Sequence, residues 1–221
     1  ILSEIRMVKD QPRHHQWTLF NQALFDSFPA KNPIYGTVKA IKSMTKEDIV
    51  SYYKKYYIAS NMVVTVVGDI SNLRAKINNS FKKMNSGSIN ITFEEKTKNK
   101  RNKKIEKKKI NQSYAVMGYK VPKRKDFDSY VLDVVRAVLG RGLSGKLFRV
   151  IRIKHGLAYD VGTINDPNID YGSFAAYFST HKNNIPKCIK LTLNEFQKLK
   201  KITTKELTEA KQFIEGEFIV D

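Results

Sequence analysis

The chain has 221 residues, 41% of them apolar, which is enough to fill the core of one large or two small domains. No apolar run reaches eighteen residues, so no transmembrane segment is predicted; the compartment stays open, with a soluble, cytoplasmic protein slightly favoured. The single cysteine, Cys188, excludes an intramolecular disulfide framework and is typical of a small core residue. The chain begins inside an amphipathic pattern without an initiator methionine, which predicts a fragment of a longer protein.

Of the net charge of +19, residues 96–109 contribute +8, from nine basic residues against Glu106, and the rest of the chain contributes +11. A Lys- and Asn-rich run without apolar periodicity cannot bury surface, so this segment is predicted to be a solvated connector. The aromatic residues lie in periodic, core-like patterns and do not alternate with basic residues, as a base-stacking surface would require. Specific nucleic-acid binding is therefore not expected, although loose affinity for polyanions is.

The segment before the connector, residues 1–95, is predicted to be mainly helical. Its helix starts carry capping residues, and one continuous β-branched run, closed by Gly68, is typical of a buried strand. The expected elements are a helix over 2–8, a helix capped by Asp10 with Pro12 in its first turn, a helix over 46–57 opened by a capping box of Thr45 and Asp48, a strand over 61–69 and a helix from Leu73 to Phe81.

The segment after the connector, residues 113–221, contains apolar runs typical of strands and amphipathic stretches of helical period. Gly156 supplies the usual left-handed end of a helix, and Thr203 with Glu206 forms a second capping box. The expected elements are strands over 113–121, 157–164 and 170–180, and helices over 127–139, 143–154, 184–200 and 204–218. Strands and helices are grouped and do not strictly alternate, so the predicted fold class is α+β, with helices on one face of the sheet.

A glycine cluster between two of these helices matches the G-x-x-x-x-G-K pattern of phosphate-binding loops, from Gly140 to Lys146. Such a loop needs a preceding strand and a Ser or Thr after the lysine. Here the preceding segment has helical periodicity, position 147 is leucine, and no acidic strand end is placed to hold a metal. The glycines are therefore predicted to form a tight connection between two packed helices, and no nucleotide site is expected.

The same region carries a more informative pattern, "LGRGLSGKLFRVIRIKHGLAYDV" (Leu139–Val161). It resembles the second-domain signature of the insulinase, pitrilysin and mitochondrial processing peptidase family. Four other stretches resemble that family in the same order: Ile1–Pro12, Asn32–Thr37, Tyr56–Ile70 and Ile202–Phe218. The resemblance implies two related α+β units, each a mainly antiparallel sheet with helices on one face and each incomplete here: residues 1–95, the connector 96–112, and residues 113–221.

The family consists of zinc peptidases with an H-x-x-E-H motif, in which two histidines bind Zn²⁺, the glutamate between them acts as general base, and a later glutamate is the third ligand. The resemblance places this third ligand at Glu4. The H-x-x-E-H motif is absent from the chain, whose histidines are His14, His15, His155 and His181. The motif is therefore expected upstream of Ile1, and the chain as given is expected to be inactive and to lack a complete zinc site.

The resemblance also implies a catalytic pair, Arg152 and Tyr159, which lie seven residues apart, as in the family. Family members use this pair to bind the substrate carbonyl across a chamber between two halves. In short-chain members these halves are separate subunits, so a homodimer or a heterodimer with a related subunit is expected.

Three functions remain open at this stage. The first is part of a zinc endopeptidase that hydrolyses peptides or unfolded segments inside a closed chamber. The second is a non-catalytic partner subunit that supplies Arg152 and Tyr159. The third, from a different class, is a basic protein that binds nucleic acid or another anion.

Overall fold

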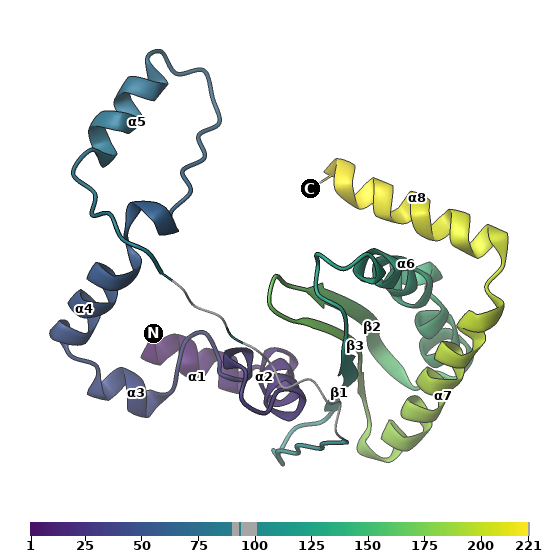
Figure 1. Cartoon of the computed structure of the whole chain (residues 1–221). Coiled ribbons are helices and arrows are strands. Elements are labelled where there is room, and N and C mark those ends of the chain that lie inside the picture. The colour runs from purple at the N-terminus through teal and green to yellow at the C-terminus, as the bar shows by residue number, and fades with distance from the viewer. Residues whose placement is uncertain (90–92, 94–100, 221) are drawn as a thin grey trace. The chain divides into compact units, whose positions relative to one another are not determined.

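The computed structural model describes residues 1–89, 93 and 101–220 of the chain (Figure 1). Residues group into two compact units, one comprising Ile1–Leu2 and Gly36–Thr92 and the other Ser3–Tyr35 and Phe93–Asp221. Residues 3–35, part of the segment predicted to precede the connector, thus pack within the second unit. No helix among the described residues combines the length and apolar character needed to cross a bilayer.

The second unit is built on a three-stranded antiparallel sheet with the strand order β1-β3-β2. Its strands are β1 (Ser113–Lys120), β2 (Ala158–Pro167) and β3 (Gly172–Thr180), all three of which the sequence predicts. The central strand β3 is almost entirely buried because it is paired on both edges and covered by helices. The mixture of helices with one antiparallel sheet confirms the α+β fold class.

One face of this sheet carries the main core. Phe174, Ala176 and Phe178 of β3 pack with buried residues from the helices that follow, including Leu139 and Cys188. These helices are α6 (Asp128–Gly140), the helical segment η4 (Phe148–Lys154) and α7 (Ile185–Lys198); the last helix, α8 (Thr204–Val220), packs on α6 through a second apolar cluster. Cys188 has no exposed surface, and burial raises the pKa of its thiol, as expected of a core residue and not of a nucleophile.

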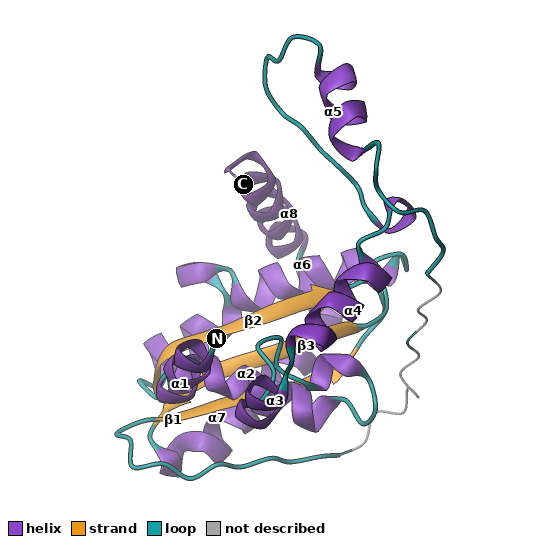
Figure 2. Cartoon of the chain, turned by 90° about the vertical axis from the view of Figure 1, so that its left-hand side faces the viewer, coloured by secondary structure: helices purple, strands orange, loops and turns teal. Residues whose placement is uncertain are grey.

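The opposite face of the sheet is also partly covered, which the sequence does not predict. After α1 (Leu2–Asp10), helix α2 (Pro12–Leu24) lies over β1, and Trp17 makes an edge contact with Tyr177 of β3, at 5.7 Å between ring centroids. Neighbouring residues of a strand point to opposite faces, so Tyr177 faces α2 while Phe178 faces the main core. Figure 2 shows α2 in front of the sheet and α6 and α7 behind it.

The first unit contains α3 (Val38–Ser43), α4 (Lys46–Tyr56) and α5 (Leu73–Phe81). The capping box of Thr45 and Asp48 opens α4 as predicted. The predicted strand over 61–69 is wrong: this stretch is irregular, and Val63 and Val67 are each 93% exposed. A strand is stable only when its backbone groups find partners, and no described residue pairs with this run. Among the described residues, the sheet that the resemblance implies for each unit is therefore formed in the second unit alone.

The part of the connector that the structure describes, residues 101–112, forms neither helix nor strand and is mostly exposed. It is nevertheless attached to α2: Asn102 Nδ2 donates to the carbonyl of Ala23 at 2.9 Å, and Glu106 bonds His15 Nε2 at 2.7 Å. The His15 side chain is largely buried as a result. The residue that covers it, Glu106, lies about ninety residues farther along the sequence. Residues 96–100, in the first half of the predicted connector, lie outside the described residues.

Candidate functional site

The segment that carries Arg152 is wound more widely than an α-helix. The sequence predicts a helix over 143–154; the structure has a short 3₁₀ turn, Gly142–Ser144, and then a π-helix, Phe148–Lys154. The His155 N–H reaches the Val150 carbonyl at 3.2 Å, and Gly156, at φ +59°, ends the helix as predicted. Single π-helical turns are rare and occur frequently at functional sites, because the extra residue per turn redirects side chains.

The glycines before this segment have steric reasons, in agreement with the predicted tight connection. A Cβ at Gly140 would lie 2.1 Å from Thr163 Oγ1 of β2, so α6 approaches the sheet at a distance that only glycine allows. A Cβ at Gly145 would lie 2.8 Å from the Leu139 carbonyl oxygen, inside the turn itself. The cluster thus positions the π-helical segment against the sheet.

Tyr159 lies at an irregularity of strand β2. Ala158 pairs with Thr180 and Asp160 with the next residue, Ser179, so Tyr159 is the extra residue of a β-bulge. A bulge changes the direction of a side chain, and Tyr159 is 73% exposed although Ala158 beside it is buried. The bulge therefore presents an aromatic ring on the surface at the start of a well-packed strand.

The structure brings Arg152 and Tyr159 into direct contact. The guanidinium carbon of Arg152 lies 4.2 Å from the centre of the Tyr159 ring and 4.8 Å from that of Phe148. Arg152 Nη1 donates a hydrogen bond to the Tyr159 carbonyl at 2.9 Å. Two rings and one hydrogen bond thus fix a cation whose Nε and Nη2 have no hydrogen-bond acceptor among the described residues.

Such a group can bind a carbonyl oxygen that develops negative charge. Its remaining N–H donors have a defined direction, and the Tyr159 hydroxyl, also without a hydrogen-bond partner in the described part of the chain, is a further donor beside them. Phe148 is the residue of this arrangement that the sequence analysis does not assign. Its position four residues before Arg152, one helical turn away, is the signal that could have indicated it.

Glu4 lies exposed in the first turn of α1. Its carboxylate is a type of ligand that zinc binds, and none of the ion pairs between described residues involves it. The histidines are dispersed: His15 bonds Glu106, His181 accepts from the Asn183 N–H, and His14 is exposed. Over the described residues, no three His, Cys, Asp or Glu side chains come close enough to hold a metal ion.

The whole fold resembles solved structures of proteins about twice as long. It matches a structure described as the peptidase M16 inactive domain from Pseudomonas fluorescens with a TM-score of 0.83 and 24% identity, over 99% of this chain and 54% of that one. A protease from Helicobacter pylori matches with a TM-score of 0.84 and 23% identity, over 99% of this chain and 55% of that chain.

Curated relatives agree with this likeness. An uncharacterized zinc protease, YmxG, of Bacillus subtilis is 27% identical over all of this chain and 54% of its own length. An uncharacterized zinc protease of Rickettsia felis is 28% identical over 96% of this chain and 52% of its own. The chain thus spans about half the length of the curated relatives it matches. Residues 43–214 match the family described as the peptidase M16 inactive domain, more than half of the sequence, so the chain belongs to the peptidase M16 family.

Proposed function

We propose that the chain is part of a zinc-dependent endopeptidase in which Arg152 and Tyr159 bind the carbonyl of a peptide substrate. The observation that carries the proposal is the guanidinium of Arg152, fixed between two aromatic rings and bonded to the Tyr159 carbonyl. A preorganised donor of this kind stabilises charge on a carbonyl oxygen without having to reorganise during the reaction. Membership of a family whose relatives are named zinc proteases supports the same reading.

In this proposal Glu4 contributes one carboxylate ligand to the zinc site, and the two histidines come from the H-x-x-E-H motif outside this chain. A bound zinc ion would act as a Lewis acid on the peptide carbonyl and activate water. The contribution of this chain is to hold the substrate: Arg152 and Tyr159 bind and orient the carbonyl, while the π-helix and the bulge keep both side chains on one surface. The substrate is a peptide or unfolded segment held in a chamber formed with a second subunit.

Elemental analysis tests the assignment of Glu4 in the full-length protein. We expect Glu4→Gln to lose most of the bound zinc, because an amide is a much weaker zinc ligand than a carboxylate. Glu47→Gln, an exposed glutamate in the first turn of α4, is the matched control and should keep the metal. Unchanged zinc content in Glu4→Gln would remove this residue from the site.

Steady-state kinetics test whether Arg152 and Tyr159 bind the substrate carbonyl. Because the stabilised charge exists mainly in the transition state, Arg152→Ala should lower kcat more than it raises KM, and losing one such donor typically costs about 10²–10³ in rate. Lys154→Ala, an exposed cation two residues away, should change kcat far less. Equal kinetics for the two variants would contradict the proposed role of Arg152.

A second candidate function has its own support. The family that residues 43–214 match is described as the inactive domain, which fits a subunit that supplies Arg152 and Tyr159 to a partner's zinc site without a complete site of its own. The gene sequence upstream of Ile1 distinguishes the two: H-x-x-E-H there supports the catalytic subunit, and an upstream domain without it supports the partner subunit.

A further inference from the structure

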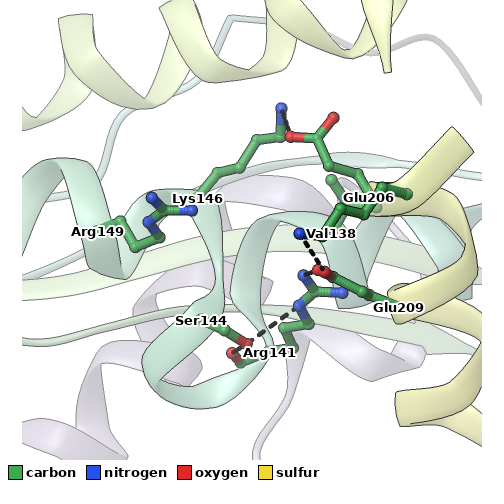
Figure 3. A pocket seen from close by; sticks show the side chains of 8 residues that line it. Val138, Arg141, Ser144, Lys146, Arg149, Glu206 and Glu209 are labelled. Carbon is green, nitrogen blue, oxygen red and sulfur yellow. Dashed lines mark hydrogen bonds and ion pairs between the residues drawn. The ribbon is translucent and has the colours of Figure 1, made fainter. Parts of the chain in front are cut away.

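The glycine-rich connection that positions η4 also forms a charged cavity with the start of α8. The cavity measures about 220 Å³ and is lined by Val138, Arg141, Ser144, Lys146, Arg149, Lys205, Glu206 and Glu209. Figure 3 shows the Lys146–Glu206 contact and the Arg141–Glu209 contact lying on either side of Val138. The lining includes four cations and two carboxylates, so its formal charge is +2.

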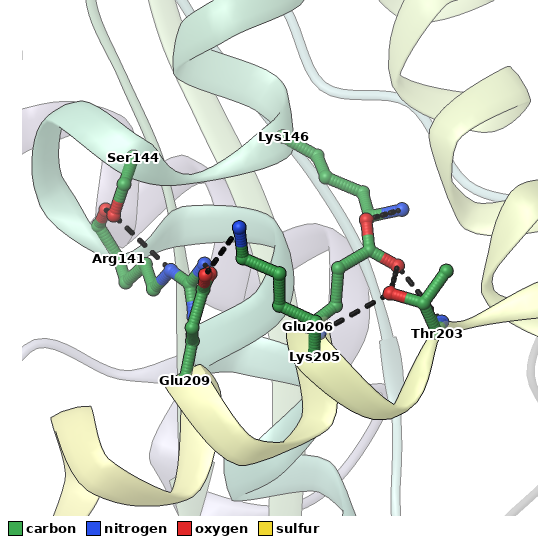
Figure 4. Close-up of polar contacts among 7 residues, drawn as sticks. All are labelled: Arg141, Ser144, Lys146, Thr203, Lys205, Glu206 and Glu209. Carbon is green, nitrogen blue, oxygen red and sulfur yellow. Dashed lines mark hydrogen bonds and ion pairs between the residues drawn. The ribbon is translucent and has the colours of Figure 1, made fainter.

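The two carboxylates already have partners. Glu206 Oε1 lies 2.7 Å from Lys146 Nζ, and its Oε2 accepts from the Thr203 N–H at 3.0 Å and the Thr203 hydroxyl at 3.1 Å (Figure 4). Glu209 accepts a hydrogen bond from Arg141 Nη2 and faces Lys205 Nζ at 4.0 Å. Both acceptor side chains are therefore engaged with groups that line the cavity or cap α8.

The cavity lining has more hydrogen-bond donors than acceptors. Nine-tenths of the Arg141 side chain is buried, and its Nη1 is enclosed without a hydrogen-bond acceptor in the described structure. The Arg149 guanidinium makes neither a hydrogen bond nor an ion pair with any described residue, and no dashed line reaches it in Figure 3. A buried cation with an unused donor is costly unless another group pairs with it.

We propose that this cavity is a binding site for a small dianion of the phosphate class, either inorganic phosphate or the phosphoryl group of a small metabolite. A dianion balances the formal charge of +2, and arginine pairs with phosphate oxygens through two parallel N–H bonds. The volume lies below the range of about 300–1,000 Å³ typical of sites for drug-sized ligands, which favours a small ion. The site differs from a Walker loop because cationic side chains, and not a row of backbone N–H groups, surround the ligand.

Isothermal titration calorimetry of the full-length protein with inorganic phosphate at pH 8 and constant ionic strength tests the proposal. We expect one saturable site per chain. Arg149→Ala and Lys205→Ala should each weaken binding about tenfold, the effect of losing one charge-assisted hydrogen bond. Lys211→Ala removes an exposed lysine from the same helix α8 but outside the cavity, and should leave the affinity unchanged.

Glu206→Gln gives a test of opposite sign. Removing this carboxylate frees Lys146 and raises the charge of the cavity, so phosphate should bind more tightly. A phosphate monoester such as glucose 6-phosphate, titrated in parallel, separates the two sources of the group: tighter binding of the monoester indicates a metabolite, and equal or tighter binding of inorganic phosphate indicates the free ion. Absence of saturable phosphate binding, or binding that the three variants inside the cavity leave unchanged, would overturn the proposal.

Discussion

Single residues decide how the proposed catalytic pair is presented. The seven-residue spacing and the glycine at 156 predict that Arg152 and Tyr159 face one rim, and the structure places them in contact. The sequence could not show that Tyr159 is a bulge residue, because a bulge depends on the register with β3, more than ten residues farther along the chain. It could not show the π-helix either, since the hydrophobic pattern of Phe148–Lys154 is compatible with an α-helix.

Substitution of Gly140 tests how closely α6 packs against the sheet. Gly140→Ala should lower the free energy of unfolding by about 1–3 kcal/mol, because the new methyl group would overlap Thr163 of β2 and force α6 away from the sheet. Gly216→Ala is a control of opposite sign: Gly216 is exposed within α8 with open space at its Cβ position, so alanine should stabilise by about 0.5–1 kcal/mol. Urea denaturation of both variants measures the difference, and equal midpoints would contradict the close approach.

At the scale of elements, the start of α8 is joined to the glycine-rich connection by an ion pair. The Lys146 ammonium and the Thr203 N–H bond Glu206 and lower the pKa of this carboxyl from its ordinary 4.5 to about 2. A depressed carboxyl pKa means that the folded protein binds the proton less readily than the unfolded chain does. The stabilisation is therefore complete above about pH 4.5 and is lost as the pH falls from 4.5 to about 2.

Unfolding measured against pH checks this assignment. Glu206→Gln should lose about 1 kcal/mol at pH 7, because it removes the ion pair with Lys146 and leaves the Thr203 N–H only a neutral, weaker acceptor. Below pH 4.5 the difference from the wild type should shrink, because Glu206 of the unfolded wild-type chain then binds a proton that the folded protein does not bind until about pH 2. Glu215→Gln, an exposed glutamate on α8, should follow the wild type at every pH. A constant difference between pH 7 and pH 2.5 would show that charge on Glu206 does not contribute.

Elements with local signals are predicted well from the sequence, and those that depend on distant partners are not. The capping boxes at Thr45 and Thr203 each open a helix, because both partners lie within one turn of the chain. The run 61–69 has strand composition but no partner among the described residues, so composition alone does not make it a strand. Contact of the connector with α2 likewise depends on His15 and Glu106, which are too far apart in sequence to indicate pairing.

At the scale of the whole molecule, the proposed function requires more than this chain. The chain matches about half of each relative, and the proposed substrate site combines Arg152 and Tyr159 with a zinc site for which this chain provides Glu4 alone. If the two halves of the chamber belong to different subunits, a variant defective in one group can be complemented by a subunit defective in the other. Recovery of activity on mixing therefore shows whether one subunit serves the zinc site of the other. This conclusion does not depend on how much activity each variant loses by itself.

Mixing two inactive full-length variants makes this test. Glu4→Gln should lack zinc but keep the pair, whereas Arg152→Ala should keep zinc but lack the guanidinium. A hybrid of the two has one chamber in which an intact zinc site faces an intact Arg152 and Tyr159, so mixing should restore up to about half of the wild-type activity per hybrid, since each hybrid has one intact site of two. Native mass spectrometry of the same sample measures hybrid formation, and a mixture of Arg152→Ala with Tyr159→Ala, defective in the same half, should recover nothing. Hybrids that form without activity would mean that each chain serves its own zinc site, which would exclude the shared chamber.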